Sequence, residues 1–552
     1  MRTGYTGHVS PSEWRWVIML SSVLVLAALF PFLWVAVSNP ASEDQRFMGA
    51  LHDYANTAGY LSKMIQGSQG EWLGQYLHTP EPHNGVLIDS LYTVLGQLAR
   101  LTRIPVIVLF HVARIGAAFF MYAGIYYLGA TIWMRLRSRR VFFVLAVFSS
   151  GLGWLLAPLL NEFNFPDLLY PELYPFYSTL VNVHLPLAVG SMAILVSAII
   201  EVLRPGTLAS PTVSNEGATI FCFSFLVTFL YPPGIVPIGI AFVVVLLARM
   251  LQHRGVSYGL RWILCLILPA VPMLLYYGTV IMYNPVVSQI WVNLNRDLLP
   301  PLWIFALSLG LPLLIALPGL YRAIRRFEQD GNQIMLLWLL AMVLLIYLTP
   351  VIQMSFGLGL MLAIAYFGTR SAEDYWFRLI PRRRRRYRTL VALLPVISLS
   401  LLVVLASPMP AFLSGASRVG SSLMLETDYL RLFEWLRMRP DQNAVVLAAP
   451  QVGVWLPAWS GQPVVYGSAH QTLNAGQKRS VVEGWYRNGD NGNCDALLDG
   501  TYTAHKRYQV QYVVYGPRER ILGNAPCLTT LDRLVSFGSV QLYVVPMMPT
   551  ED

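Results

Sequence analysis

The sequence predicts a polytopic α-helical membrane protein that carries a small α/β domain at its C-terminal end. Of its 552 residues, 55% are hydrophobic and only 12% are charged, and the mean hydropathy is +0.52. Many runs approach the ~20 apolar residues that cross a hydrocarbon core of ~30 Å. After about Ser407 the composition changes to that of a soluble domain. The apolar, weakly charged composition of the chain as a whole excludes an ordinary soluble protein.

About eleven spans are expected in residues 1–407, the transmembrane domain. The first, residues 14–38, is too long for the apolar core of a signal peptide and has no evident cleavage site. Ten further runs follow it, at residues 104–133, 141–160, 177–203, 218–230, 234–251, 258–282, 302–321, 333–347, 351–368 and 390–405.

Basic residues set the predicted orientation. Arginines gather in loops at 135–140, 322–326 and 370–388, and an excess of Lys and Arg marks the cytoplasmic side. The N-terminus is therefore expected inside and the C-terminus outside, in a cell membrane. The net charge of +10 is explained by this orientation signal, and we expect no nucleic-acid partner.

The first outer loop, residues 39–103, is long and polar. Residues 42–67 are expected to be helical with a broad apolar side, and residues 85–101 form a shorter amphipathic stretch. Both are predicted to lie at the membrane interface.

Residues 408–552 are predicted to form an extracytoplasmic α/β domain. Strands are expected at 444–447, 463–466, 510–515 and 540–545, with a helix at 430–438. Cys494 and Cys527 both fall in this part, where an oxidising compartment would allow a disulfide between them. The sequence leaves that pairing open.

The predicted spans contain almost no ionisable residues. A proton- or sodium-coupled transporter usually needs carboxylates near the bilayer midplane, and the span interiors have none, which disfavours transport. Arg114 is the exception. It either pairs with a carbonyl or carboxylate in the fold or contacts a lipid phosphate.

Polar chemistry is therefore expected at the outer surface. Asp53 lies close enough to lipid headgroups to meet a lipid-linked substrate, although it also fits a solvated helix face; Asp44, nearer the first span, competes for the same role. Glu81 and His83 belong to a loop stiffened by two prolines, which suits either a ligand contact or a plain turn.

Loose coordination of Mg²⁺ or Mn²⁺ by Asp53 and a second-loop acid is possible but not required, and no zinc spacing is present.

Several short segments then resemble the GT-C superfamily of membrane glycosyltransferases. The shared layout is one span, a large outer loop with an early Asp, many further spans and an extracytoplasmic domain. The local likeness rests on Asp53-Tyr54-Ala55-Asn56, Gly70-Glu71-Trp72-Leu73, Thr79-Pro80-Glu81-Pro82-His83, His111-Val112-Ala113-Arg114 and Ser150-Gly151-Leu152-Gly153-Trp154.

The resemblance implies sugar transfer from a polyprenyl-phosphate-linked donor to a glycan, lipid or protein acceptor, with inversion at the anomeric carbon. It implies that Asp53, or alternatively Asp44, is the base, and that Asp167 or Glu172 takes the second acidic position. Lys63, Arg103 and Arg114 are the candidates to stabilise the leaving phosphate. Related members often have an Arg at the outer start of a late span, whereas this chain has none near Gln353.

Two other functions fit the sequence. One is a lipid or polysaccharide transporter. The other is a catalytically inactive relative whose outer domain binds a glycan or a partner.

Overall fold

A computed structural model describes most of the chain: residues 9–38, 45–204, 215–253, 256–294, 299–327, 331–350, 352–380, 385, 388–389, 393–394, 396–409, 422–439, 444–492, 494–498 and 508–546. The chain divides into two compact units. The helical unit comprises Met1–Leu29, Ala113–Tyr277 and Asn295–Ser407, and the α/β unit comprises Phe30–Val112, Gly278–Leu294 and Pro408–Asp552. Each unit is described by itself.

Seven helical segments in the described residues, one of them interrupted by a break, are long and apolar enough to cross a membrane. They lie at Pro11–Val35, Val106–Ile132, Leu136–Leu160, His184–Val202, Pro232–Met250, Gly259–Tyr283 and Leu302–Arg326. Two shorter apolar helices are α10 (Asn215–Leu230) and α15 (Asn332–Leu348). A multi-pass membrane protein is therefore confirmed, whereas the count of eleven spans stays a prediction.

Several predicted spans are broken helices. Residues 141–160 divide between α5 (Leu136–Phe148) and α6 (Gly153–Leu160), and residues 177–203 between α8 (Pro175–Val181) and α9 (His184–Val202). Residues 351–368 give only the 3₁₀ turn η1 (Met354–Gly357) and α16 (Leu360–Ser371). Gly359 separates those two with a φ of 80°, a backbone conformation that costs glycine least.

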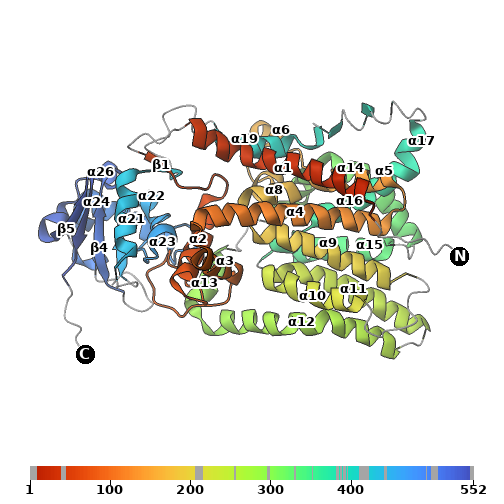
Figure 1. Ribbon diagram of the computed structural model, residues 1–552, viewed down its shortest axis with the longest axis horizontal. Coiled ribbons are helices and arrows are strands. Elements are labelled where there is room, and N and C mark those ends of the chain that lie inside the picture. Colours follow the sequence, from red (N-terminus) through yellow and green to blue (C-terminus); the bar gives the residue numbers. More distant parts are fainter. Residues whose placement is uncertain are drawn as a thin grey trace. The chain divides into compact units, whose positions relative to one another are not determined.

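Three helices of the helical unit extend into the α/β unit: α1 (Pro11–Ser38), α4 (Val106–Ile132) and α12 (Val256–Tyr283). The other elements of the helical unit are α7 (Pro166–Leu169), α11 (Pro232–His253), α14 (Leu302–Arg326), η2 (Ala372–Trp376), α17 (Phe377–Leu379) and α19 (Leu399–Ala406). Helix α9 packs against α10 and α11, and Figure 1 shows these three side by side.

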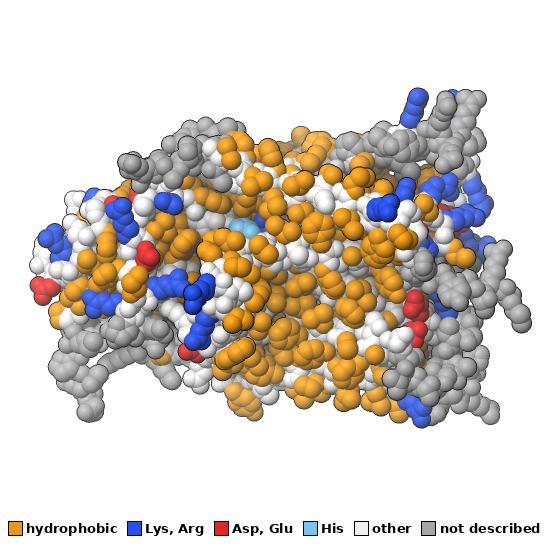
Figure 2. Space-filling model, in the orientation of Figure 1, with side chains coloured by type: hydrophobic (Ala, Val, Ile, Leu, Met, Phe, Trp, Pro, Cys, Tyr) orange, Lys and Arg blue, Asp and Glu red, His pale blue; other side chains and the backbone are white. Residues whose placement is uncertain are grey.

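The helical unit has an apolar exterior. Helix α12 alone exposes Leu260, Leu264, Leu268 and Leu275, and Figure 2 shows a broad field of hydrophobic side chains over this unit. Such a surface in water would be costly, whereas lipid tails cover it without loss.

The α/β unit is built around a four-stranded sheet with the order β3-β4-β6-β5. Strand β3 (Val445–Leu447) pairs in parallel with β4 (Val510–Tyr515), and β6 (Val540–Val544) runs antiparallel to both β4 and β5 (Asp532–Phe537). The strand predicted at 463–466 is reduced to a bridge between Val464 and Val446.

The helices and the 3₁₀ turn of this part of the chain pack against the sheet or against one another. They are α21 (Thr427–Arg437), α22 (Pro450–Gly453), α23 (Leu456–Ser460), α24 (Ala475–Gly492), α25 (Asp495–Leu498), α26 (Pro517–Leu522) and the 3₁₀ turn η3 (Pro526–Thr530). Trp485 and Tyr486 of α24 pack into one core with Val510 and Val513 of β4. Burying such large side chains is the main stabilising contribution to a unit of this size.

The first outer loop belongs to the same unit. Strand β1 (Gln45–Phe47) pairs antiparallel with β2 (Met424–Glu426), and α2 (Tyr54–Gln69) packs against α3 (Ser90–Thr102) and α23. Helix α13 (Pro285–Leu294) completes the unit. The prediction of one helix over residues 42–67 is wrong at its start, because residues 45–47 are taken up by a strand whose partner lies far along the chain. Most of α2 is buried, so it is not a helix lying free at the membrane interface.

Candidate functional site

Asp53 stands immediately before α2, in a left-handed backbone conformation (φ 47°, ψ 46°). Left-handed conformations cost most residues roughly 1–2 kcal/mol, and Asp and Asn tolerate them best. Both carboxylate oxygens accept hydrogen bonds from the Asn56 amide, at 3.0 and 3.1 Å, and the Asp53 carbonyl accepts one from the Thr57 N–H at 3.0 Å. These bonds fix the direction of the carboxylate.

The Asp53 carboxylate is reached by solvent and yet closely surrounded by protein. Loss of water around the charged form raises its pKa to about 6, and the hydrogen bonds from Asn56 oppose that shift only in part. A carboxylate with this pKa is largely ionised at pH 7 and is a stronger base than an ordinary Asp. This is the property expected of a general base near neutral pH.

Packing within the α/β unit holds the first turn of α2 in place. The Tyr54 ring stacks on Trp455, with 6.4 Å between ring centroids, and the Trp455 indole N–H donates to the Ser422 carbonyl at 2.5 Å. Gly59 lies so close to Gln471 that an added Cβ would approach its side-chain nitrogen to 2.2 Å. Asp53 is therefore carried on a rigid element, which favours accurate positioning of a reactive group.

Lys63, predicted to contact substrate, is buried within the α/β unit. Its ammonium pairs with Asp89 at 2.8 Å, donates to the Ile88 carbonyl at 3.0 Å and lies 4.2 Å from the centre of the Tyr76 ring. These contacts tie α2 to the start of α3, which gives Lys63 a structural role.

Glu81 and His83 are also engaged inside the protein. Glu81 pairs with Lys478 at 2.5 Å and accepts a short hydrogen bond from the Thr79 hydroxyl. His83 bridges the Glu81 carbonyl at Nδ1, 2.8 Å, and the Tyr76 N–H at Nε2, 3.0 Å. This pattern requires the neutral ring with its proton on Nδ1, and burial lowers the His83 pKa accordingly.

The two candidate arginines differ in exposure. Arg103 ends α3 in a left-handed conformation and is exposed. Arg114, in α4 of the helical unit, is buried and donates to the Leu180 carbonyl at 2.6 Å. Arg103 is thus accessible to an anionic ligand, whereas Arg114 already bonds to the protein backbone.

Asp167 and Glu172, the two candidates for the second acidic position, lie in the helical unit. Asp167 is fully buried and accepts hydrogen bonds from the Gly153 N–H at 2.9 Å and the Ser400 hydroxyl at 2.5 Å. Burial raises the Asp167 pKa to about 6. Glu172 is half-buried, and its backbone carbonyl accepts from the Gly359 N–H at 3.4 Å. Asp167 therefore joins α6 to α19, which is a packing role.

The structure brings only some of the predicted residues together. Glu81 and His83 share one buried network, and Lys63 lies near enough for its charge to lower the His83 pKa. Asp53 is bonded to Asn56, a partner that sequence reasoning missed. The spacing of Asn56 three residues after Asp53 was the available signal, since it suits side-chain contacts at a helix start. Asp44 lies outside the described residues.

Metal-ligating side chains do not cluster in the part of the chain that the structure describes. Across the residues that the structure describes, no three His, Cys, Asp or Glu side chains converge as a metal site would require. The Mg²⁺ or Mn²⁺ site that the sequence allowed stays a prediction, and we assign no step to a metal.

Cys494 and Cys527 form a disulfide, with 5.5 Å between their Cα atoms. Both belong to the packing of the main core of the α/β unit, where Cys527 is fully buried. The bond joins the start of α25 to η3.

No protein-family model matches this sequence. No curated protein matches it either. Among solved structures, the oligosaccharyltransferase AglB from Archaeoglobus fulgidus, in complex with an inhibitory peptide and a dolichol-phosphate, is similar over 98% of this chain and 76% of its own, at 11% identity and a TM-score of 0.51. ArnT from Cupriavidus metallidurans, bound to undecaprenyl phosphate, covers 98% of this chain and 100% of its own at 12% identity and a TM-score of 0.47.

The similarity to AglB shows that the chain has the fold of GT-C membrane glycosyltransferases. The resemblance predicted from the sequence is confirmed at the level of the fold. At this identity the similarity carries no residue assignment.

Proposed function

We propose that this protein is a membrane glycosyltransferase that moves a sugar from a polyprenyl-phosphate-linked donor to an acceptor at the outer face of a membrane. AglB, whose fold it shares, was solved with a dolichol-phosphate, which supports a lipid-linked donor. The observation that carries the proposal is Asp53: a solvent-accessible carboxylate, rigidly held before α2, with its pKa raised to about 6.

The proposed step is a single displacement. The Asp53 carboxylate accepts the proton of an acceptor hydroxyl or amide, and the acceptor atom forms a bond to the anomeric carbon. The bond from that carbon to the phosphate oxygen breaks, and its electron pair leaves with the phosphate. Holding acceptor and donor together at the water boundary while the lipid tail stays in the bilayer contributes the advantage of proximity.

The phosphate that leaves carries additional negative charge and needs a cation. Of the three basic residues predicted for this role, Arg103 is exposed, Lys63 is held by Asp89, and Arg114 donates to Leu180. Arg103 is therefore the residue we assign to phosphate contact.

The test measures release of the free lipid carrier, which is the polyprenyl phosphate left after the sugar is transferred. Membranes containing the protein are supplied with undecaprenyl-phosphate-linked hexoses and pentoses, and free undecaprenyl phosphate is measured by mass spectrometry. We expect Asp53→Asn to lower release by about 10²–10⁴-fold, the usual contribution of a general base. Glu434→Gln, an exposed acid on α21, is the matched control and should leave release unchanged. Full release by the Asp53→Asn protein would refute the assigned role.

One observation favours a second function, in which the α/β unit binds a glycan or a partner and the protein is catalytically inactive. Lys63, Glu81 and His83 are all occupied by buried contacts within the α/β unit, as expected if this unit binds a glycan or a partner without catalysing a reaction. In that case the wild-type protein would release no carrier from any donor, and donor would stay chemically unchanged.

A further inference from the structure

Helix α3 of the α/β unit has an exposed apolar face. Val94, Leu98 and Leu101 are 45%, 41% and 81% exposed, and intervals of four and three residues place them on one side of the helix. The buried side packs against α2, and Figure 1 shows the two helices side by side. Of the two segments predicted to lie at the membrane interface, only α3 keeps an apolar face that the described part of its unit leaves uncovered.

The turn that follows α2 extends this face. Trp72 and Leu73 are exposed, and the backbone around them is bonded to α3. The Thr93 hydroxyl donates to the Trp72 carbonyl at 3.2 Å, and the Gln97 side-chain amide donates to the Glu71 carbonyl at 3.0 Å. Two segments that are separate in the sequence therefore present one apolar surface. We call it the α3 surface, made of Trp72, Leu73, Val94, Leu98 and Leu101.

The chain holds the end of α3 close to the start of a candidate membrane span. Helix α4 is long and apolar enough to cross a bilayer, and it begins at Val106, four residues after α3 ends at Thr102. Four peptide units extend at most ~15 Å. With 27 residues α4 is ~40 Å long, more than the ~30 Å of a hydrocarbon core, so its first turn reaches the boundary of the bilayer. The last turn of α3 must lie near that boundary as well.

Exposed apolar side chains continue from α3 into this span. Ile104, Val108 and Val112 are all exposed, at intervals of four residues. Lipid covers the exposed side chains of a membrane span, and the same lipid is within reach of α3 through the short connection. This continuity favours the bilayer, rather than a second protein, as the partner of the α3 surface.

The charged residues nearby suit the headgroup layer. Arg100 and Arg103 are exposed at the end of α3, and Glu71 is exposed on the turn before it. Lys63 and Asp89, which belong to α2 and to the residue before α3, bond to each other at 2.8 Å. Long basic side chains extend to the headgroups while their stems stay in apolar surroundings, and Trp is enriched at the same level.

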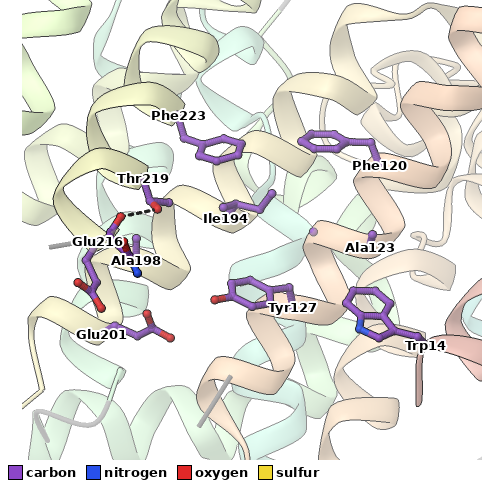
Figure 3. A pocket seen from close by; sticks show the side chains of 12 residues that line it. Trp14, Phe120, Ala123, Tyr127, Ile194, Ala198, Glu201, Glu216, Thr219 and Phe223 are labelled. Carbon is purple, nitrogen blue, oxygen red and sulfur yellow. Dashed lines mark hydrogen bonds between the residues drawn. The ribbon is translucent and has the colours of Figure 1, made fainter. Parts of the chain in front are cut away.

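The helical unit has an apolar hollow of a different kind. A groove of about 530 Å³ between α4, α9 and α10 is lined in part by Phe120, Ile194 and Phe223 (Figure 3). It lies among candidate spans, where contact with lipid tails is expected for any apolar side chain. The α3 surface lies outside those spans, so its exposure in water would be costly without a partner.

We propose that the α3 surface inserts into the boundary between headgroups and acyl chains and is a membrane anchor of the α/β unit. Helix α3 lies along this boundary with Val94, Leu98 and Leu101 toward the acyl chains, as an amphipathic interfacial helix does. The Trp72 ring lies at headgroup level. The proposal rests on exposure and chain connectivity and is independent of the proposed sugar transfer.

The anchor also has a consequence for α2. The Tyr60 and Tyr92 rings stack with 4.3 Å between their centroids, and Gly67 and Gly96 allow the two helices to approach closely. Because α2 and α3 pack as one body, membrane contact of α3 fixes the direction of α2 relative to the bilayer.

The experiment places a fluorescent probe on the α3 surface of the full chain in phosphatidylcholine nanodiscs. The two free cysteines, Cys222 and Cys265, are replaced by Ser, and Leu98→Cys or Leu101→Cys is labelled with bimane. Fluorescence is measured with iodide in the water and with phosphatidylcholine that carries a nitroxide on its acyl chain. We expect the nitroxide lipid to quench both probes and iodide to leave them nearly unchanged.

Two control positions calibrate the quenching. Leu268→Cys labels an exposed residue within the candidate span of α12 and should respond to the nitroxide lipid. Ile521→Cys labels an exposed apolar residue of α26, which Figure 1 shows far from α3 in the same unit, and should respond to iodide. Melting curves verify that each variant is folded.

The result can contradict the proposal in two ways. Iodide quenching at Leu98 and Leu101 as strong as at Ile521 would show that water covers the α3 surface. Protection of both probes from both quenchers would show that protein covers it, either a partner or a second copy of this chain. Either outcome overturns the proposal, and neither depends on whether the protein releases carrier.

Discussion

The Glu81 carboxylate and the Lys478 ammonium form an ion pair of 2.5 Å in which both side chains are almost completely buried. Glu81 comes from the first outer loop and Lys478 from α24. Desolvation lowers the Lys478 pKa, and the charge of Glu81 opposes that shift. The pair therefore joins two distant segments of the α/β unit through charges that water does not screen.

Removing one partner of this pair should be strongly destabilising. Glu81→Gln or Lys478→Met leaves an uncompensated buried charge or polar group, and such changes cost about 3–5 kcal/mol. The measurement is thermal unfolding of the purified full chain. The double variant Glu81→Gln with Lys478→Met should recover part of the loss, whereas a loss equal to the sum of the two single losses would mean that the residues do not interact.

Such partners cannot be predicted from one sequence. Glu81 and Lys478 are separated by 397 residues, and no local pattern specifies their pairing. The same reason explains the error at residues 45–47, where pairing with β2 outweighs the helical periodicity of the segment. By contrast, the apolar runs predicted at 14–38 and 258–282 agree closely with α1 and α12, because length and hydropathy are local properties.

The candidate site shows the same contrast between local features, which the sequence reveals, and features that depend on the fold. Asp53 could be selected from the sequence because an acid near a predicted interface is a local feature. Its left-handed backbone, its bonds from Asn56 and its raised pKa depend on the surrounding fold. The contacts of Lys63 have a related cause: its charge is visible in the sequence, and its pairing with Asp89 is not.

The disulfide between Cys494 and Cys527 should stabilise the α/β unit. It closes a loop with a sequence separation of 33, for which the loss of unfolded-chain entropy corresponds to about 3–4 kcal/mol. Replacing both cysteines by Ala should lower the melting temperature, and a reductant should do the same to the wild type only. If the reductant affects both proteins equally, the bond does not carry this stability.

Buried histidines should make the α/β unit sensitive to acid. Burial lowers the His78 pKa to about 4, and its Nε2 bonds to the Val454 carbonyl at 2.9 Å. Between pH 6.5 and 4 the unfolded chain binds the extra proton, so stability is complete above pH 6.5 and falls as the pH decreases. The loss is of order 3 kcal/mol across this window. His78→Gln should have a flatter dependence of melting temperature on pH, and an unchanged slope would contradict this assignment.

Asp167 should be needed for stability more than for chemistry. Asp167→Ala leaves the Gly153 N–H without its buried acceptor, a loss that costs about 1–3 kcal/mol, whereas the Ser400 hydroxyl can still donate to the Gly151 carbonyl at 3.1 Å. We expect a lower melting temperature, and Ser400→Ala should reproduce part of it. Glu162→Ala, a half-buried acid nearby in sequence, is the control. Unchanged melting together with lost carrier release would instead indicate a direct role for Asp167 in the reaction.

Asp53 should show the opposite combination, lost activity with retained stability. Its pKa is about 6 in the folded protein and near 3.9 in an unfolded chain. The folded state therefore binds the proton more tightly, so the contribution of Asp53 to stability falls as the pH rises from about 4 to 6 and stays unfavourable above it. Asp53→Asn removes this unfavourable ionisation and keeps a residue that tolerates the left-handed backbone. At pH 7.5 its melting temperature should be equal to or higher than that of the wild type.

Carrier release by the wild type should decline tenfold per pH unit below about 6, as the base becomes protonated. A variant that melts markedly lower, or a wild-type rate that is constant from pH 7 to 5, would assign Asp53 to the packing of α2 rather than to proton transfer.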